Sequence, residues 1–258
     1  MLLAAGRGER MRPLTDTCPK PLLNVQGKPL MQWHLEELAA GGVQRVVINT
    51  AWLGDMIEQT FGNDFQTRSK QGLDRSRSKM KHLPLHYSHE GRDFGGALET
   101  AGGIGRALPQ LCPQPPGAAS DVFWVLAGDV FTPGFEFCQD AAQRFVRSGK
   151  LAHLWLVPNP PHNPKGDFGL DDAIGLALNL PAADPRPRFT YSTIGLYHRA
   201  LFAPPWCRIA PGNPAGVKAA LAPLLRAAMD QGQVSAELYT GAWTDVGTPQ
   251  RLAELNAT

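Results

Sequence analysis

The residues most able to do chemistry in this chain lie close together within positions 1–23, MLLAAGRGERMRPLTDTCPKPLL. Gly6 and Gly8 lack a Cβ atom, so the backbone can bend freely there and an anion can approach its N–H groups. Arg10, Arg12 and Lys20 add cationic donors, the arginines as planar forks and the lysine as a point charge. Backbone donors combined with these cations suit the binding of a triphosphate.

Two better-known glycine-rich phosphate sites do not fit this stretch. A P-loop requires Gly-x4-Gly-Lys-Ser/Thr, and no lysine with a hydroxyl residue follows Gly8 in that spacing. A dinucleotide-binding fingerprint requires a third glycine three positions after Gly8, where this chain has Met11. Because Pro13, Pro19 and Pro21 block helix formation, we expect an ordered loop in this region.

Two aspartates follow segments that are predicted to be strands. Asp129 stands just beyond the carboxyl end of the apolar segment 122–126, and ligands of open α/β sheets bind at such ends. Its carboxylate offers the hard oxygen ligand that Mg²⁺ prefers, although Gly-Asp pairs are also common in turns. Asp245 stands at a second predicted strand end, before a helix. Asp245 could instead cap the helix that is predicted to begin at Pro249, but Thr248 is better placed for that role.

The string Gly-x-Gly-x-Arg-Met-x-Pro-Leu-Thr-x3-Pro-Lys-Pro-Leu at 6–22 resembles the signature of the sugar-phosphate nucleotidyltransferases, also called NDP-sugar pyrophosphorylases. Glu9 stands where this family often has threonine, and the form Gly-Glu-Arg-Met-Arg-Pro is most similar to a muramate-specific bacterial branch. Segments 98–104, 166–170 and 191–195 also resemble the family. The resemblance implies a three-layer, doubly wound α/β fold with a mainly parallel, mixed sheet, which is the Rossmann-like (GT-A-like) nucleotidyltransferase fold.

The resemblance also implies which residues form the site. Asp129 and Asp245 would hold a Mg²⁺ cofactor, and with Arg10 and Lys20 they would form the catalytic set. The positions implied on the nucleotide side are Ala5, Gly6, Gly8, Glu9, Arg10, Lys20 and Gly102. The positions implied on the sugar side are Glu99, Asp167 and Gly169.

Some of these positions depart from the family pattern or have a structural alternative. Ala101 replaces a glycine in the block at 98–103, and Ala127 stands where relatives often have asparagine, which weakens any inference about the sugar. Gly102 and Gly103 could serve tight helix packing instead of the approach of a base or ribose. Glu99 could equally be a solvated helix residue.

The activity that the resemblance implies is nucleotidyl transfer. An oxygen of a sugar 1-phosphate would attack the α-phosphorus of a nucleoside triphosphate and expel pyrophosphate. Since the second pKa of a phosphate monoester is near ~6, this nucleophile needs no general base. The muramate-specific branch implies UTP and N-acetylmuramate 1-phosphate, used in cell-wall sugar recycling, with base selection expected at residues 87–95. The alternative is a nucleotidyltransferase that uses CTP, GTP or dTTP with another hexose or heptose phosphate or with phosphocholine. A further alternative is an inactive regulatory homologue.

The elements that must position these residues are predicted from hydrophobic periodicity. Alternating strands and helices through the first two thirds favour a largely parallel sheet covered on both faces. We expect one nucleotidyltransferase domain over 1–258, with a nucleotide-binding part at 1–150, a sugar-phosphate-binding part at 151–258 and no C-terminal β-helix domain. Helices are predicted at 29–40, 54–61, 97–108, 135–147, 218–229 and 249–255, and strands at 1–5, 45–50, 83–88, 122–126, 151–157, around 168 and at 189–197.

The composition narrows the class and the location of the protein. With 258 residues, 43% of them hydrophobic, the chain can bury one substantial core. A net charge of +2 gives no sign of nucleic-acid binding, so phosphate binding must be local. Four cysteines without a Cys-x-x-Cys pair argue against disulfides and zinc, and neither a signal peptide nor a membrane span is visible. We therefore expect a cytoplasmic monomer, in which the basic stretch 68–82 is a solvated insertion.

Overall fold

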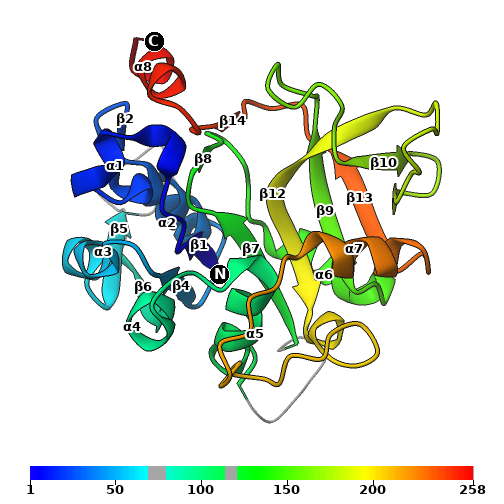
Figure 1. Cartoon of the computed structure of the whole chain (residues 1–258), viewed down its shortest axis with the longest axis horizontal. Helices are drawn as coiled ribbons and strands as arrows, with labels where there is room; N and C mark the ends of the chain where they lie inside the picture. Colours follow the sequence, from blue (N-terminus) through cyan, green and yellow to red (C-terminus); the bar gives the residue numbers. More distant parts are fainter. Residues whose placement is uncertain (69–79, 114–120, 258) are drawn as a thin grey trace. The chain divides into compact units, whose positions relative to one another are not determined.

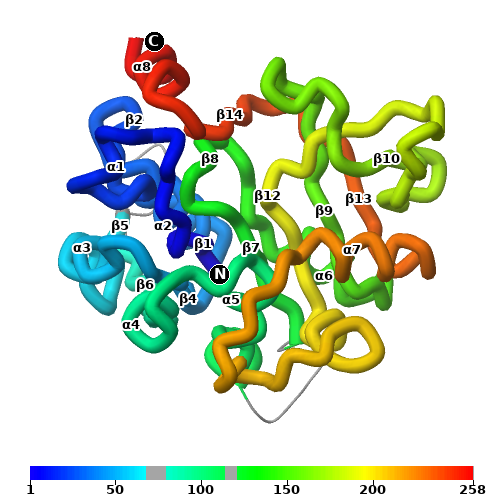
Figure 2. Tube along the Cα trace, in the orientation of Figure 1, coloured from blue at the N-terminus to red at the C-terminus, as the bar shows by residue number. Residues whose placement is uncertain are grey.

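The computed structural model describes residues 1–68, 80–113 and 121–257, so most of the basic stretch 68–82 lies outside the described residues. The chain divides into two compact units, each built from separate segments. The N-terminal unit contains Leu2–Ala97, Gly128–Ala141 and Thr244–Thr258, and the central unit contains Met1, Leu98–Ala127 and Ala142–Trp243. Figure 1 shows the elements, and Figure 2 follows the path of the chain from blue to red.

Four strands, hydrogen-bonded in the order β1-β4-β6-β5, form the centre of the N-terminal unit. Strands β1, β4 and β6 are parallel, and β5 runs antiparallel to β6. The predicted strands at 1–5, 45–50 and 83–88 are therefore confirmed, and the third is longer than predicted. Their bounds are β1 (Leu2–Ala4), β4 (Val46–Thr50), β5 (Asp64–Arg68) and β6 (Met80–His89).

Two predicted helices of this unit are also confirmed, α2 (Leu30–Ala40) and α3 (Gly54–Phe61). Helix α2 begins directly after Pro29, which can start a helix because its missing N–H group is not needed there. Its apolar stripe, which includes the fully enclosed His34, is buried as the periodicity predicts. A short helix, α4 (Glu90–Phe94), follows β6 directly.

The segment between β1 and α2 differs from the helix-free loop that its prolines predict. It contains three short helical turns, followed by a small antiparallel hairpin. Each turn is only three or four residues long, and prolines stand at the starts of the second and third turns, where a helix needs no N–H donor. These elements are η1 (Glu9–Met11), α1 (Leu14–Thr17), η2 (Lys20–Leu22), β2 (Asn24–Val25) and β3 (Lys28–Pro29).

Distant segments of the sequence share one buried cluster in the N-terminal unit. The members of this cluster come from the first 30 residues, from the strand after Asp129 and from the end of the chain: Met11, Leu23, Val25, Leu30, Phe131, Val246 and Leu252. Strand β8 (Val130–Phe131) pairs antiparallel with β14 (Thr244–Asp245), and α8 (Pro249–Ala257) follows. Burial of these apolar side chains holds residues 129 and 245 close to the N-terminal loop.

The strands of the central unit are hydrogen-bonded in the order β10-β11-β13-β9-β12-β7. Here β9 and β13 are parallel, while the pairs β10–β11, β10–β12, β11–β13, β12–β7 and β12–β9 are antiparallel. The strands are β7 (Val122–Ala127), β9 (Ala152–Val157), β10 (Phe168–Asp171), β11 (Leu176–Leu178), β12 (Arg188–His198) and β13 (Val234–Leu238). The remaining helices are α5 (Glu99–Leu111), α6 (Gln139–Ser148), η4 (Arg199–Phe202) and α7 (Ala222–Met229).

Two predicted helices begin later than expected. Helix α6 starts at Gln139 instead of 135, because Phe135 and Phe137 are both buried, an alternation that fits extended backbone. Helix α7 starts at Ala222 instead of 218, because the backbone of Ala219 instead hydrogen-bonds with residues near the start of α5. Within the described residues, no helix is long and apolar enough to cross a membrane.

Candidate active site

Three residues that are far apart in the sequence form a charged cluster in the N-terminal unit. The ammonium of Lys20 lies 2.6 Å from Oδ2 of Asp129 and 3.8 Å from Oδ1 of Asp245. The lysine side chain is 9% exposed, whereas the side chains of Asp129 and Asp245 are 37% and 19% exposed. Two carboxylates thus converge on one enclosed cation.

Backbone contacts fix the position of Asp129. The Gly128 N–H group donates to the Leu3 carbonyl at 2.8 Å, and a Cβ atom at Gly128 would lie 3.0 Å from that same oxygen. The Val246 N–H group donates to the Asp129 carbonyl at 3.0 Å, next to the β8–β14 pair. Glycine before the aspartate is therefore explained by close approach to the end of β1.

A buried histidine on α2 holds the turn that carries Asp129. Nε2 of His34 lies 2.8 Å from the Val130 carbonyl oxygen, so this nitrogen carries the proton that it donates. Burial lowers the pKa of His34 to about 4, although its backbone hydrogen bond and the charge of Asp129 oppose that shift. His34 is thus neutral around pH 7, and it stabilises the backbone next to Asp129 through this hydrogen bond.

Asp245 is bound by two arginines in addition to Lys20. Nη1 of Arg251 donates to Oδ2 of Asp245 at 2.9 Å and to its carbonyl oxygen at 2.7 Å. Nη2 of Arg10 lies 4.0 Å from Oδ2, and the Arg10 side chain is 67% exposed. Arg251 was not among the predicted site residues, because the sequence pattern does not reveal a contact that depends on the turn between β14 and α8.

The glycine-rich loop is held by its own side chains. Gly8 has a φ of 69°, and the hydroxyl of the buried Thr15 donates to the Gly8 carbonyl at 2.9 Å. The Arg7 guanidinium lies 3.7 Å from the centre of the Trp52 ring, and both side chains donate to the Thr15 carbonyl. Arg7 therefore braces the loop, a role that its sequence position did not reveal.

The other predicted residues of this loop differ in exposure. Gly6 is exposed, and a Cβ atom there would meet nothing within 4 Å among the described residues. Glu9 is exposed and forms ion pairs with Arg7 and Arg12 at 3.8 and 3.6 Å. Ala5 is buried at the end of β1. The loop thus presents Gly6, Glu9 and Arg10 to solvent, whereas Ala5 and Lys20 are buried.

A buried polar link joins the neighbouring strands. The Asn49 side-chain oxygen accepts from the Ala4 N–H group at 2.9 Å, and its amide donates to the fully buried Glu90 at 2.7 Å. The link connects the end of β1 with residues 87–95, where base selection was expected. Asn49 and Glu90 are therefore supporting residues of the site's surroundings.

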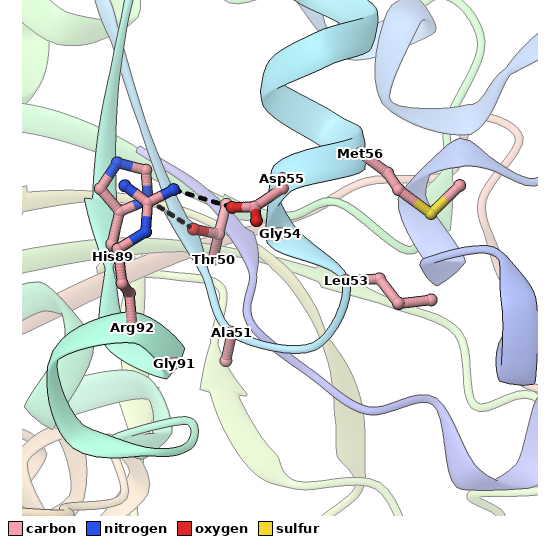
Figure 3. A pocket seen from close by; sticks show the side chains of 9 residues that line it. All are labelled: Thr50, Ala51, Leu53, Gly54, Asp55, Met56, His89, Gly91 and Arg92. Atoms are coloured by element: carbon pink, nitrogen blue, oxygen red, sulfur yellow. Dashed lines mark hydrogen bonds and ion pairs between the residues drawn. The ribbon is translucent and has the colours of Figure 1, made fainter.

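Residues 87–95 also line part of a pocket of about 320 Å³ at the ends of β4 and β6 (Figure 3). Figure 3 shows His89 and Arg92 on one side and Asp55 on the other, linked by an Arg92–Asp55 ion pair of 2.8 Å. A volume of this order is typical of small-molecule pockets. The nine lining residues are Thr50, Ala51, Leu53, Gly54, Asp55, Met56, His89, Gly91 and Arg92.

Two predicted residues lie at the start of α5, in the central unit. Glu99 is exposed and has a φ of 59°, which is unfavourable for a residue other than glycine. The Gly102 N–H group donates to the Ala219 carbonyl at 3.1 Å, and a Cβ atom at Gly102 would lie 2.4 Å from the Val217 carbonyl oxygen. This close approach accounts for the glycine at 102 through packing.

The other predicted sugar-side residues belong to the central unit as well. Both carboxylate oxygens of Asp167 accept hydrogen bonds, one from the Asn163 amide and one from the Tyr191 N–H group. Gly169 is buried, and a Cβ atom there would clash with Leu180. Thr193, which was not predicted, has a φ of 66° and a buried hydroxyl with no hydrogen-bond partner within the described part of the chain.

The structure therefore brings Arg10, Lys20, Asp129 and Asp245 together in one unit, and places Glu99, Gly102, Asp167 and Gly169 in the other. Across residues 1–68, 80–113 and 121–257, no group of three or more His, Cys, Asp or Glu residues is arranged to hold a metal ion. The pair Asp129–Asp245 offers two carboxylates. The two acids lie among three cations, Lys20, Arg10 and Arg251, so the cluster carries a formal charge of +1 (three minus two).

Comparisons with known proteins point to one family. The family model described as nucleotidyl transferase matches residues 1–170. The chain is 44% identical to the N-acetylmuramate alpha-1-phosphate uridylyltransferase of Neisseria meningitidis serogroup B, over 100% of this chain and 96% of the relative. It is 36% identical to the enzyme of that name from Caulobacter vibrioides, over 48% of this chain and 46% of the relative.

A solved structure with the same fold belongs to a Bacillus anthracis protein named as a glucose-1-phosphate thymidylyltransferase, in complex with sucrose. The TM-score is 0.71 at 20% identity, and the match covers 99% of this chain and 92% of that one. The Rossmann-like α/β fold with a mixed sheet is therefore confirmed.

Proposed function

This chain belongs to the nucleotidyl transferase family, as a sugar-phosphate nucleotidyltransferase, and we propose that it transfers the uridylyl group of UTP to N-acetylmuramate 1-phosphate. The products would be a UDP-sugar and pyrophosphate, in cell-wall sugar recycling. The proposed substrates rest on the full-length similarity to the Neisseria relative. The observation that carries the proposed site is the convergence of Asp129 and Asp245 on the buried ammonium of Lys20.

The chain's own residues act mainly by holding two repelling anions in line. The second pKa of the acceptor phosphate, near ~6, leaves its attacking oxygen ionised at neutral pH, so no side chain needs to remove a proton. Lys20 steadies the acceptor phosphate or the α-phosphate, and Arg10 balances the charge that develops on the departing pyrophosphate. Gly6 and Gly8 let the triphosphate approach the backbone N–H groups of the loop, beside Ala5 and Glu9.

We further propose that the cofactor is Mg²⁺, held by Asp129 and Asp245. Their oxygens already face one cation, the Lys20 ammonium, at 2.6 and 3.8 Å, and two hard carboxylate ligands suit a small divalent ion. When bound, Mg²⁺ supplies charge neutralisation at the α-phosphate. The side chains of Asp129 and Asp245 are partly exposed, so an ion and its water ligands can reach them.

The acceptor side is proposed to use Glu99, Asp167 and Gly169, with Gly102 on the nucleotide side. Support comes from the strained backbone of the exposed Glu99, because such strain persists mainly where function requires it. Thr193 lies in the segment 191–195 that is expected on this side, and its buried hydroxyl supports a polar role there. Residues 87–95 are proposed to select the base.

The whole chain, 1–258, is proposed to act as one nucleotidyltransferase domain and as a monomer. A cytoplasmic location is proposed because the sequence has only four cysteines, far apart and without a Cys-x-x-Cys pair, which fits a reducing compartment. Incubation of the purified protein with UTP, N-acetylmuramate 1-phosphate and Mg²⁺, followed by ³¹P NMR, tests the proposed reaction. We expect pyrophosphate and a diphosphate-linked sugar in equal amounts, and neither with Asp129→Ala. Product formation by Asp129→Ala at the wild-type rate would contradict the proposed site.

A further inference from the structure

Arg251 makes two hydrogen bonds to a single residue, Asp245. One guanidinium nitrogen, Nη1, donates to the Asp245 carbonyl oxygen at 2.7 Å and to carboxylate Oδ2 at 2.9 Å. The two side chains are 18% and 19% exposed, so this charge-assisted contact is mostly shielded from water. Arg251 thus holds the backbone and the side chain of Asp245 together.

Helix α8 holds Arg251 in place. The Thr248 hydroxyl accepts from the Arg251 N–H group at 3.3 Å, and the Thr248 carbonyl accepts from Leu252 at 3.2 Å. Leu252 belongs to the buried cluster that also contains Val246. The first turn of α8 is therefore anchored on both sides of Arg251, and the arginine is preorganised for Asp245.

The two oxygens of Asp245 have different neighbours as a result. Oδ2 lies near the two arginines, at 2.9 Å from Arg251 and 4.0 Å from Arg10. Oδ1 lies on the side of Lys20, at 3.8 Å, where Asp129 also converges. Rotation about the last bond of an aspartate is soft. The contact of Arg251 to Oδ2 restrains this rotation, and its contact to the Asp245 carbonyl fixes the guanidinium relative to the backbone.

We propose that Arg251 is a positioning residue that reserves Oδ1 of Asp245 for the divalent cation, so that Asp245 binds the ion through one oxygen. The inference rests on the proposed function, in which Asp245 holds Mg²⁺. Binding through one carboxylate oxygen fits the octahedral preference of Mg²⁺, whereas Ca²⁺ also accepts both oxygens of one carboxylate. Arg251 would therefore favour Mg²⁺ over Ca²⁺ as well as strengthen its binding.

The test measures UTP binding by calorimetry without the sugar phosphate, at a series of Mg²⁺ concentrations. Partners of metal ligands typically contribute ~10–100-fold to metal affinity, so Arg251→Met should need at least ~10-fold more Mg²⁺ than the wild type for the same UTP affinity. Arg251→Lys, which keeps a donor, should lie between them. Gln250→Met is the matched control, since Gln250 is exposed on the same helix and pairs with Glu254, and it should need the wild-type Mg²⁺ concentration.

The same titrations with Ca²⁺ separate positioning from a general structural effect. In Arg251→Met the requirement for Ca²⁺ should rise less than that for Mg²⁺, with the thermal unfolding of Arg251→Lys confirming an intact fold. An unchanged Mg²⁺ requirement in Arg251→Met, or equal changes for the two ions, overturns the proposal. Asp245→Asn distinguishes the two claims, because wild-type turnover in that variant would refute Asp245 as a Mg²⁺ ligand, whereas no turnover by the wild type would refute the proposed function.

Discussion

The ammonium of Lys20 lies 2.6 Å from the Asp129 carboxylate, although 109 positions separate the two residues in the chain. Lys20 comes from a short turn after the glycine-rich loop, and Asp129 follows a glycine that packs against the end of β1. The fold therefore places a buried cation beside the acid proposed to bind the metal. This relationship makes the lysine and the aspartates testable as one set.

Lys20→Ala should lower kcat by ~10²–10³-fold, because it removes a preorganised charge from a site where two anions must meet. The fold should persist, since Asp129 and Asp245 remain partly open to water. Initial rates of pyrophosphate release, with thermal unfolding followed by circular dichroism, check both statements. Lys28→Ala is the matched control, because Lys28 pairs with Glu36 outside the cluster, and it should keep the wild-type rate. Equal rates for the two variants would refute the role of Lys20.

Asp129→Asn and Asp245→Asn should each reduce turnover by at least ~10³-fold at saturating Mg²⁺. The double variant should be little worse than either single one, since residues that act as a unit give strongly non-additive losses. Steady-state kinetics on the four proteins measure this coupling. Losses that multiply in the double variant would show that the two carboxylates act independently, against the shared-ion proposal.

We expect Gly8→Ala to lower the stability of the protein and Gly6→Ala to weaken the binding of UTP. Alanine at Gly8 must adopt a φ near 69° and would place its Cβ 3.0 Å from a Thr15 methyl carbon, so we expect a stability loss of ~1–2 kcal/mol. Alanine at Gly6 meets no described protein atom within 4 Å, so the stability should hold while KM for UTP rises. Urea unfolding and UTP kinetics measure the two effects. A wild-type KM for Gly6→Ala would argue against anion approach at Gly6.

The neutral His34 should make the protein less stable in mild acid. Its pKa is about 4 in the folded state, below the usual 6.5, so only the unfolded chain takes up this proton as the pH falls below 6.5. The stabilising contribution is therefore complete above pH 6.5 and is lost progressively towards pH 4. Between pH 7.5 and 5 the loss from this one group is ~2 kcal/mol.

Urea unfolding of the wild type and His34→Leu at pH 7.5 and pH 5 measures this contribution. The variant lacks the hydrogen bond to Val130 and should be less stable at pH 7.5, but its stability should fall less between the two pH values. An identical pH dependence in both proteins would show that His34 is not the group responsible.

Much of the fold could be predicted because the hydrophobic pattern within each segment indicates its helix or strand. The apolar strand before Asp129 and the stripe on α2 have the periodicity of their elements, and their bounds agree with the structure within a few residues. The start of α7 could not be predicted, because the preceding Ala219 backbone is engaged by α5 through contacts between distant residues. Local pattern carries no information about such pairings.

The candidate site also contains residues that the sequence could reveal and residues that it could not. Lys20, Asp129 and Asp245 could be found from motif and position, and the structure brings them within a few ångströms of one another. Arg251 could not be found, because its role depends on a two-residue strand and the turn that follows it. The role of Arg7 could not be predicted for a related reason, since only the folded loop places its guanidinium over the Trp52 ring.

The most direct test of the central claim is the rate of pyrophosphate release over a panel of UTP, CTP, GTP and dTTP, each with N-acetylmuramate, glucose and mannose 1-phosphates and with phosphocholine, in the presence of Mg²⁺. The account predicts that UTP with N-acetylmuramate 1-phosphate has the highest kcat/KM, by at least about tenfold, or ~1.4 kcal/mol of transition-state binding. A higher kcat/KM for another pair would contradict the proposed substrates. No release with any pair would contradict the proposed activity of the site.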